Sequence, residues 1–487
     1  MGRKKREFNR LRLDSGQHRR IMLVSALLGA LAFLPVGLRL YSLMVTNYDY
    51  YSSLALRNQT RTTTVTADRG DIFDRNMNIL ATSVSVENVY LDPHELKQSK
   101  ADIPEIARTL GEILGKDPAW IEEQAADIKR RYKQVGTRID EETAGKIRDY
   151  INEKGISGIH LEPTSQRVYP YETLAAQVVG FTNASNEGCE GVEAAYNSFL
   201  AGSTGRVITT KGNNEMDMPF SYENYVSSRQ GDSVILTLDA TVQACLEKQL
   251  SAAIARYDVQ NGAFGLVMNC KTGEILAMAT LGSYDLEIAD EGTAAQLEEM
   301  KRVYLAEPEG SEAYEAGKTA YGEALSAARL KQWRNRVISD GYEPGSTFKL
   351  VTLAAALDCG AVTENSTFYC GGHETFNDRE QEVSCWKAAG HGMQTTIEAL
   401  GHSCNIAFGH IGVNMTRKTF VEYFKAFGFL EKTGVDLPGE ASGLFWDEND
   451  FSVANLISAS FGQTFRVTPM EQVRAIAAIV NGGYLLK

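Results

Sequence analysis

A long apolar stretch near the N-terminus predicts one membrane-spanning helix. Residues 21–38 carry no charge, and the apolar character resumes after Arg39 as far as Val45. A helix of this length can cross a bilayer, with the Arg39 guanidinium extended to the interface. A cleaved signal peptide would have a shorter apolar core, about 7–15 residues, before a small-residue cleavage site. The segment ends instead in Val45-Thr-Asn-Tyr-Asp-Tyr-Tyr51, so we expect an uncleaved anchor over residues 21–45.

The pattern beyond the anchor predicts two regions of mixed α and β structure. Residues 46–230 combine strand-like alternation around residues 61–66 with apolar residues at helical spacing over residues 101–153. Residues 231–487 begin with short apolar runs that are typical of strands, and these alternate with a helical segment. The strands are expected at 233–239, 263–269 and 274–280, and the helix at 241–257. A chain of 487 residues has room for two or three domains.

Charge is distributed unevenly along the chain. The net charge is −13, yet the first twenty residues hold eight Lys and Arg against two acidic residues, which leaves −19 on the remainder. An acidic body argues against a nucleic-acid partner. Basic residues before an apolar segment place residues 1–20 in the cytoplasm by the positive-inside rule, and the body outside the cell.

Candidate catalytic chemistry stands at the start of a predicted helix over residues 347–357. Pro344 and Gly345 interrupt the preceding chain, and Ser346 and Lys349 follow three positions apart. Positions three apart share one helix face, so the Lys349 amine can reach the Ser346 hydroxyl. Burial would lower the lysine pKa and allow the amine to act as a base for this serine. The first helical turn also offers unpaired backbone N–H groups to a developing oxyanion.

The spacing is common, and a second copy exists at Ser384 and Lys387, which we interpret as structural. The first copy is supported by a second motif downstream. Glu343-Pro-Gly-Ser-Thr-Phe-Lys349 followed by His402-Ser-Cys-Asn405 resembles the active site of the penicillin-binding proteins, specifically the class B transpeptidases. This group carries Ser-x-x-Lys, Ser-x-Asn and Lys-Thr-Gly motifs.

The resemblance extends over nearly the whole chain and implies an α+β protein with an N-terminal membrane anchor. Residues 46–230 would form an elongated, mixed α/β pedestal, the dimerisation domain, which opens with a motif at Arg69-Gly-Asp-Ile-Phe-Asp-Arg75. Residues 231–487 would form the transpeptidase domain, an antiparallel sheet flanked by helices. Within the pedestal, Arg167 and Glu193 are expected to make buried structural ion pairs.

The resemblance also implies a serine acyl-enzyme mechanism on peptidoglycan stem peptides that end in D-Ala-D-Ala. Ser346 would attack the penultimate carbonyl with Lys349 as base, and an amine of a neighbouring stem peptide would resolve the acyl-enzyme. Ser403 would relay the proton to the leaving D-Ala, and Asn405 would orient Lys349 and the substrate amide. The implied substrate-binding positions are Asn405, Thr347 and Cys404.

Partners follow from the same resemblance. They are the stem peptides, the lipid-linked precursor, β-lactam antibiotics that acylate the same serine, the membrane and a polytopic membrane glycosyltransferase. No cofactor is implied. Division, elongation and sporulation members share these motifs, and the cysteines near the site favour the division and sporulation branch.

Two other functions fit part of the pattern. A β-lactamase or β-lactam sensor also uses Ser-x-x-Lys, although the large pedestal favours the transpeptidase. A catalytically inactive wall-assembly scaffold is the second, because Lys-Thr-Gly occurs only in unsuitable places. Lys271-Thr-Gly273 precedes the nucleophile in a predicted turn, and Lys432-Thr-Gly434 lies just before another turn. We therefore interpret the sequence as C-terminally incomplete and expect an incomplete catalytic sheet and an inactive chain.

Seven cysteines in an exported chain of this length do not indicate a disulfide framework. Cys370 and Cys385 bracket fourteen residues and either form a disulfide beside the site or remain buried thiols. No Cys or His group has zinc spacing, so no metal is expected. His391 is expected to pack near the mouth of the site. The acidic insertion over residues 283–335 is expected to be a solvated surface excursion.

Overall fold

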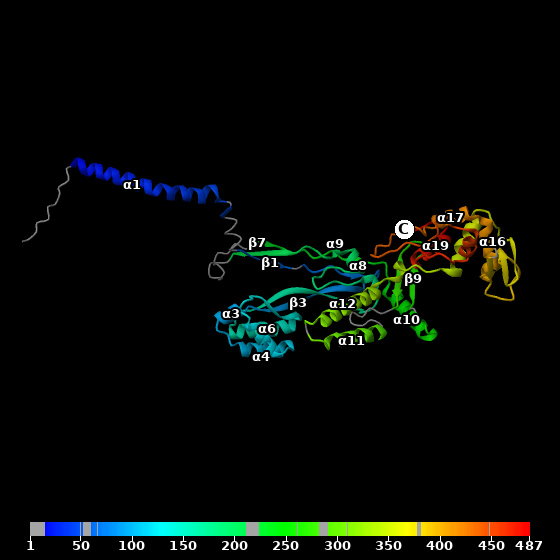
Figure 1. Cartoon of the computed structure of the whole chain (residues 1–487), viewed down its shortest axis with the longest axis horizontal. Helices are drawn as coiled ribbons and strands as arrows, with labels where there is room; N and C mark the ends of the chain where they lie inside the picture. Colours follow the sequence, from blue (N-terminus) through cyan, green and yellow to red (C-terminus); the bar gives the residue numbers. More distant parts are fainter. Residues whose placement is uncertain are drawn as a thin grey trace, which may run out of the picture. The chain divides into compact units, whose positions relative to one another are not determined.

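The fold was analysed in a computed structural model, in which the chain forms two compact units. The first unit comprises residues 1–65 and 204–227, and the second comprises residues 66–203 and 228–487. Each unit is described by itself (Figure 1). The residues that the structure describes are 15–48, 50–51, 60–65, 67–210, 224–260, 262–281, 291–308, 310–376, 381–447 and 449–487.

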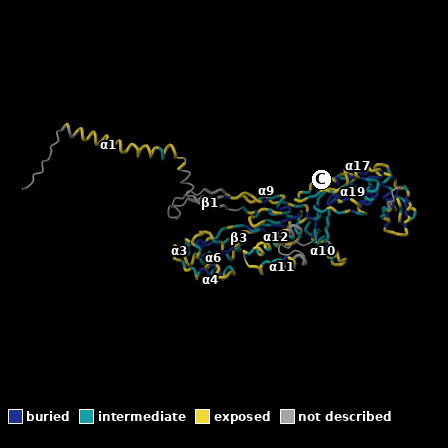
Figure 2. Tube along the Cα trace, viewed as in Figure 1, coloured by how far each residue is buried: buried dark blue, intermediate teal, exposed yellow. Residues whose placement is uncertain are grey.

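The first unit contains the apolar helix and a small sheet. Helix α1 (Ser15–Tyr41) continues into a π-helical turn, η1 (Ser42–Thr46). The 28-residue span Arg19–Thr46 contains an 18-residue stretch with a mean hydropathy of 2.4. None of this stretch is buried (Figure 2), and the span is long and apolar enough to cross a membrane. The predicted apolar helix over residues 21–45 is confirmed, while residues 1–14 of the basic tail lie outside the described residues. The sheet is antiparallel in the order β1-β6-β7: β1 (Thr60–Val65), β6 (Gly205–Thr210) and β7 (Asn224–Val226).

The pedestal in the second unit is built on a five-stranded sheet with β3 (Ile79–Leu91) at its centre. β3 pairs antiparallel with its neighbours on both sides, and β2 pairs in parallel with β8. Ile72 faces Val234 in this parallel pair, so the sheet joins two distant parts of the chain. The other four strands are β2 (Ile72–Phe73), β4 (Lys133–Ile139), β5 (Ile159–Val168) and β8 (Val234–Ile235).

Helices cover this sheet and enclose an apolar core. Figure 1 shows α4 and α6 together beside β3, and Leu91, Leu110 and Ile147 are fully buried between them. Asp side chains cap several of these helices and accept hydrogen bonds from the backbone N–H groups of the first turn. The helices are α3 (Pro93–Gln98), α4 (Ile103–Leu114), α5 (Pro118–Ala126), α6 (Glu141–Lys154), α7 (Ala176–Val179), α8 (Gly191–Ala195) and α9 (Asn197–Leu200).

The continuous helical prediction over residues 101–153 is wrong at Lys133–Ile139, which forms β4. This segment pairs with β3 and buries Val135, while Gln134 and Thr137 are not buried. Backbone pairing with a long buried strand therefore outweighs the helical periodicity of its flanks.

A buried ion-pair network within the pedestal links β5 and α8 to the chain just before β2. Arg69 Nε lies 2.5 Å from Glu193 Oε2, and Arg167 Nε lies 2.7 Å from Glu193 Oε1. The Glu193 side chain is inaccessible to solvent, and both arginines are nearly so. The prediction that Arg167 and Glu193 form structural ion pairs is confirmed, and Arg69 completes the network.

The C-terminal region of the second unit, residues 231–487, contains a two-stranded antiparallel sheet, β9 (Phe264–Met268) and β10 (Ile275–Thr280). Helix α10 (Ala240–Tyr257) packs on these strands, and α19 (Pro469–Val480) contacts β9. Over the residues described, β9 and β10 pair only with each other. Met278 nevertheless lies in the core that this sheet shares with the pedestal.

The main core of this region surrounds Phe348 at the end of a 3₁₀ turn, η2 (Gly345–Phe348). The Phe348 ring contacts four other phenylalanine rings, with centroid separations from 4.7 to 6.2 Å. Figure 2 shows the buried residues concentrated in this lobe. Its helices are α13 (Arg336–Ser339), α14 (Lys349–Asp358), α15 (Thr396–Gly401), α16 (Asn405–Met415), α17 (Arg417–Ala426) and α18 (Val453–Ser460).

Two short antiparallel ladders lie between α14 and α16 in the chain. They pair β11 (Thr367–Cys370) with β14 (Gly392–Thr395), and β12 (His373–Phe376) with β13 (Gln381–Ser384). β13 ends at Ser384, whose carbonyl oxygen accepts a hydrogen bond from Asn405 at the N-terminal end of α16.

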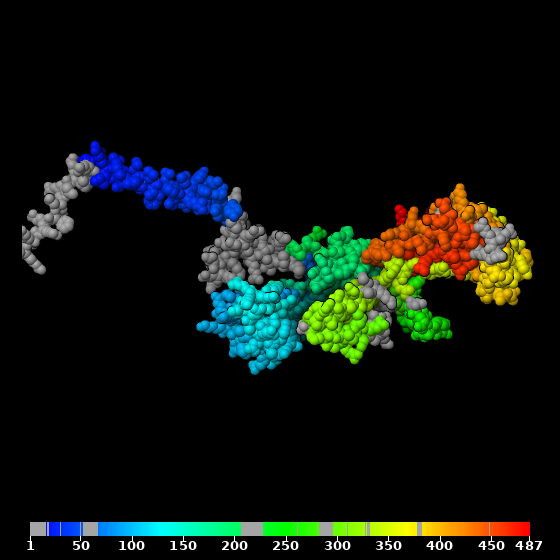
Figure 3. Space-filling view, in the orientation of Figure 1, coloured from blue at the N-terminus to red at the C-terminus, as the bar shows by residue number. Residues whose placement is uncertain are grey.

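The acidic insertion forms a helical hairpin of α11 (Glu291–Leu305) and α12 (Glu312–Trp333). Tyr304 packs on Tyr314 and Tyr321, each with a centroid separation of 5.6 Å. Figure 3 shows the hairpin as a bright green lobe at the surface of this unit. Residues 282–290 at its start lie outside the described residues.

Candidate active site

Ser346 is exposed at the beginning of a tight helical turn rather than within an α-helix. In place of the predicted helix over residues 347–357, the structure has two elements: the 3₁₀ turn η2, which contains Ser346, and helix α14, which begins at Lys349. Thr347 Oγ1 donates a hydrogen bond to Pro344 O at 2.7 Å and closes the turn. Ser346 therefore projects from the mouth of the helix, as the Pro-Gly sequence predicts.

Two glycines fix this turn from behind. Gly345 N–H donates to Gly462 O at 2.9 Å. Gly345 has φ +58° and Gly462 has φ +84°, a region in which only glycine is unstrained. A Cβ on Gly462 would lie 2.0 Å from Gly345 O, so the backbones can approach only without a side chain there.

Lys349 is buried and surrounded by four oxygen atoms. Its Nζ lies 2.7 Å from Ser403 O and 2.7 Å from Asn405 Oδ1. It also lies 3.0 Å from Ser403 Oγ and 3.3 Å from Ser346 Oγ. Only 1% of Lys349 is exposed, and its amine stands 5.5 Å from the centre of the Phe408 ring. The structure thus brings Ser346, Lys349, Ser403 and Asn405 together.

This set of oxygens suits a neutral amine. The two carbonyl oxygens can only accept hydrogen bonds, and they take the shortest contacts. A neutral amine has two N–H donors for them and one lone pair left to accept a proton from a hydroxyl. The two hydroxyls within reach belong to Ser346 and Ser403, so either can donate to Lys349.

Burial lowers the pKa of Lys349 to about 8, because charge is poorly solvated in the interior. The Cys385 and Cys404 thiols oppose this effect and raise the pKa by a smaller amount. A substantial fraction of Lys349 is therefore neutral near neutral pH, as a general base requires.

Ser403 and Asn405 reach Lys349 from a strained turn. Ser403 has φ +50°, which is unfavourable for a residue with a side chain. Asn405 begins α16 and donates from Nδ2 to Ser384 O at 3.2 Å. Trp386 Nε1 donates to His402 O at 2.9 Å. Both bonds tie the turn to the segment that follows β13.

The two further positions that the sequence predicts as substrate-binding differ in access. Thr347 is exposed beside Ser346, although its hydroxyl is engaged with Pro344. Cys404 is fully buried, so the predicted substrate contact does not extend to its side chain. Burial also raises the pKa of the Cys404 thiol to about 12.

The remaining motif copies contribute no side chain to this cluster, although Ser384 O accepts the hydrogen bond from Asn405. Ser384 ends β13, and Lys387 is exposed two residues beyond Cys385. Lys271-Thr-Gly273 forms the turn between β9 and β10, and Lys432-Thr-Gly434 lies in an irregular segment. Neither Lys-Thr-Gly copy is on a strand, in agreement with the sequence interpretation.

A group that sequence analysis missed adjoins the cluster. One ligand atom from each of Cys370, Cys385, His391 and Cys404 lies within 4.8 Å of the others. All seven cysteines are free thiols in the structure, so the disulfide between Cys370 and Cys385 stays a prediction. The expectation of no metal rested on local spacing, which cannot detect ligands from separate segments.

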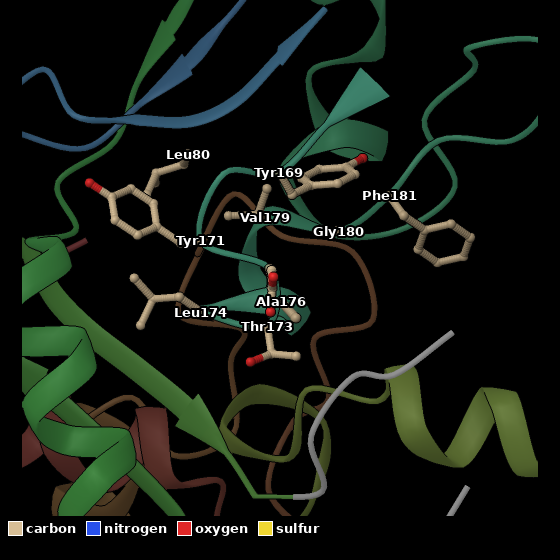
Figure 4. A pocket seen from close by; sticks show the side chains of 10 residues that line it. Leu80, Tyr169, Tyr171, Thr173, Leu174, Ala176, Val179, Gly180 and Phe181 are labelled. Atoms are coloured by element: carbon tan, nitrogen blue, oxygen red, sulfur yellow. The ribbon is translucent and has the colours of Figure 1, made fainter. Parts of the chain in front are cut away.

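A separate pocket of about 350 Å³ lies in the pedestal. Figure 4 shows Tyr169, Tyr171 and Phe181 around it, with Leu80 and Leu174. None of its lining residues belongs to the Ser346 cluster, so it is not the active site.

Comparisons with known proteins identify the two regions around this cluster. Residues 263–487 match the Penicillin binding protein transpeptidase domain, and residues 64–236 match the Penicillin-binding Protein dimerisation domain. The cluster of Ser346, Lys349, Ser403 and Asn405 falls within the first match, and the buried network of Arg69, Arg167 and Glu193 falls within the second.

Relatives match over almost the whole chain. Stage V sporulation protein D of Bacillus subtilis is 30% identical over 476 residues, which cover 98% of this chain and 67% of that protein. Peptidoglycan D,D-transpeptidase FtsI of Escherichia coli K12 is 28% identical over 476 residues, covering 95% of this chain and 70% of that protein.

Solved structures share the fold. Penicillin Binding Protein 2X from Streptococcus thermophilus aligns with a TM-score of 0.65 at 24% identity, covering 87% of this chain and 60% of that one. The penicillin-binding protein in a complex of PBP2 and MreC from Helicobacter pylori aligns with a TM-score of 0.66 at 22% identity, covering 88% and 77%. The chain belongs to the class B penicillin-binding proteins, the serine-type peptidoglycan D,D-transpeptidases of division and sporulation.

Proposed function

We propose that Ser346 is the nucleophile and Lys349 the general base of this transpeptidase. The observation that carries the proposal is the buried Lys349 amine, which faces two carbonyl-type acceptors and two hydroxyls. A lysine in water would be protonated and unable to take the serine proton. The lowered pKa favours the neutral form that can, and the Ser346 and Ser403 hydroxyls lie within its reach.

In the first half-reaction, Ser346 Oγ attacks the carbonyl carbon of the penultimate D-Ala of a stem peptide. Its proton passes to Lys349, and the serine–carbon bond forms as a tetrahedral adduct. Collapse of the adduct breaks the peptide bond, and Ser403 passes a proton from Lys349 to the departing D-Ala amine. The product is an ester between Ser346 and the stem peptide.

In the second half-reaction, the amine of a neighbouring stem peptide attacks this ester. Lys349, neutral again, takes the amine proton through Ser403, and Ser346 is released with its proton restored. Asn405 keeps Lys349 oriented through Oδ1 in both halves. The result is a cross-link, and β-lactams are attacked by the same serine.

We also propose that one membrane-spanning helix anchors the protein, with residues 1–20 in the cytoplasm and the second unit outside the cell. The charge balance around the apolar helix supports this orientation. Cross-linking needs glycan strands made from the lipid-linked precursor, so we propose a polytopic membrane glycosyltransferase as partner. Protease added to spheroplasts should digest the second unit, and a protected unit would contradict the orientation.

The nucleophile is tested with fluorescent penicillin on membranes from cells that produce the protein from its gene. Ser346→Ala should abolish labelling, whereas Ser384→Ala should leave it nearly unchanged. The two variants remove the same hydroxyl from the same Ser-x-x-Lys spacing, so the second controls for the first. Mass spectrometry that finds the acyl group on Ser384 would overturn the assignment.

A further inference from the structure

Three cysteines and one histidine from separate segments converge beside the active site. Cys370 ends β11, Cys385 follows β13, His391 precedes β14, and Cys404 caps α16. Their ligand atoms all lie within 4.8 Å of one another. We propose that these four side chains bind one zinc ion.

Two of the six ligand separations match those around a tetrahedral zinc ion. Zn–S bonds of about 2.3 Å and Zn–N bonds of about 2.0–2.1 Å place two sulfurs about 3.8 Å apart, and a sulfur and a nitrogen about 3.5 Å apart. Cys385 Sγ lies 3.9 Å from Cys404 Sγ and 3.6 Å from His391 Nδ1. The other separations are at most 4.8 Å, so small side-chain movements would close the four ligands around one ion.

The chemistry of the ligands selects zinc and a closed structural site. Thiolate and imidazole are ligands for zinc, whereas magnesium and calcium prefer oxygen. Four protein ligands fill a tetrahedron and leave no position for substrate or water. Each cysteine releases its proton to solvent as its sulfur binds the ion, and three thiolates with a neutral imidazole leave a net charge of −1 on the site.

The three cysteine ligands are enclosed by the protein. Cys370, Cys385 and Cys404 are buried, with exposed fractions of 1%, 7% and 0%. Backbone N–H groups of Lys387 and Asn405 are directed at the Cys385 sulfur. The same N–H groups can stabilise the charge of a metal-bound sulfur.

The proposed ion would hold the turn that presents Ser403 and Asn405 to Lys349. Cys404 stands between these two residues, and Ser403 adopts a strained left-handed conformation. A metal bond to Cys404 would fix this turn against Cys370 and Cys385, on the other side of the site. This consequence rests on the proposed function, because it predicts that metal loss slows acylation of Ser346.

The metal itself is tested without reference to activity. The full chain, purified in detergent without added chelator, should contain about one zinc per chain by mass spectrometry of the metal. Replacing zinc by Co²⁺ should produce the intense visible bands and the thiolate charge-transfer band of a tetrahedral site. Cys370→Ser and His391→Ala should lower bound zinc by at least about tenfold. Cys359→Ser, at an exposed cysteine, is the matched control and should retain the ion.

The possible results separate the alternatives. A metal-free protein with two thiols missing from titration without reductant would show a disulfide in place of the ion, and would overturn the proposal. A metal-free protein in which all seven thiols titrate would also overturn it. If the variants fail to fold, the Co²⁺ spectrum and a fall in Tm after chelation of the unsubstituted protein decide the question. Bound zinc without penicillin labelling would refute the proposed function and leave the metal site standing.

Discussion

Two Ser-x-x-Lys segments of this chain share a spacing and differ in every physical respect that matters for catalysis. Lys349 is buried at the start of α14 and faces four oxygens, whereas Lys387 is exposed beyond the end of β13. Ser346 lies in a tight turn fixed by Gly345 and Gly462, whereas Ser384 is a strand residue. The comparison shows that a motif marks a candidate, and that burial and arranged acceptors make the base.

The largest contrast is expected when each lysine is removed. Lys349→Ala should slow acylation by fluorescent penicillin by about 10²–10⁴-fold, since it removes the general base. Lys387→Ala should change the rate less than about twofold. Stopped-flow or quenched labelling of membrane-bound protein measures both. Equal losses in the two variants would show that burial does not distinguish them.

A second contrast concerns the backbone behind Ser346. Gly462 and Gly434 both have φ +84°, but only Gly462 has backbone atoms within reach of an added Cβ. Gly434→Ala should cost about 1–2 kcal/mol of stability through strain alone. Gly462→Ala should cost at least about 3 kcal/mol and abolish labelling, because the clash displaces Gly345. Denaturant unfolding measures the stability difference, and similar costs at the two glycines would contradict it.

The pH dependence of acylation sharpens the difference between the two lysines. The neutral form of Lys349 is the active one, so the rate should rise about tenfold per pH unit below pH about 8 and level off above it. Lys349→Arg should remove this rise. A rate that is flat from pH 6 to 9 in the unsubstituted protein would rule out Lys349 as the titrating base.

The same lowered pKa makes the stability of the folded chain depend on pH in the alkaline range. The folded-state pKa of Lys349 lies below its unfolded value of 10.5. Between pH about 8 and 10.5 the unfolded chain binds more protons, so the stability contribution of this group increases with pH in that window. Lys349→Met should therefore flatten the dependence of unfolding free energy on pH there.

The smallest effect is expected when the hydrogen bond between Trp386 and His402 is removed. Trp386→Phe removes the indole donor to His402 O and should lower stability by about 1 kcal/mol, with a modest decrease in acylation. Trp446→Phe serves as a control at another partly exposed tryptophan. Thermal unfolding compares the two variants, and an unchanged Tm for Trp386→Phe would show that this bond does not hold the turn.

The sequence predicted the parts of the site that depend on local spacing. Ser346 and Lys349 are three positions apart, and Pro344 and Gly345 mark the start of their turn, so their contact follows from helix geometry. The apolar helix and the strands β9 and β10 were predicted for the same reason, since their periodicity is local. The resemblance to class B penicillin-binding proteins supplied Ser403 and Asn405, which spacing alone could not.

Features built from distant segments were missed. Lys349 donates a hydrogen bond to the main-chain oxygen of Ser403. This contact depends on the left-handed conformation of Ser403, which the residue type does not predict. β4 was assigned to a helix because its strand character comes from pairing with β3. The positions of Cys370, Cys385, His391 and Cys404 in the sequence do not match a zinc-binding motif. Their side chains meet only in the folded chain, where the short ladders bring separate segments together.

The parallel pairing of β2 with β8 sets an order on how the chain can fold. Ile72 and Val234 are neighbours in the sheet, yet most of the pedestal lies between them in sequence. Contacts over such separations form late, because a long loop must first be closed. During synthesis and export, β3 and its helices can assemble while the edge beside β2 waits for residues 234–235. The Val234 and Leu236 amides, which donate to Asp71 O and Phe73 O, should then acquire protection from hydrogen exchange after those of β3 and β5. An interrupted nascent chain that ends before residue 234 would leave that edge open to other partners.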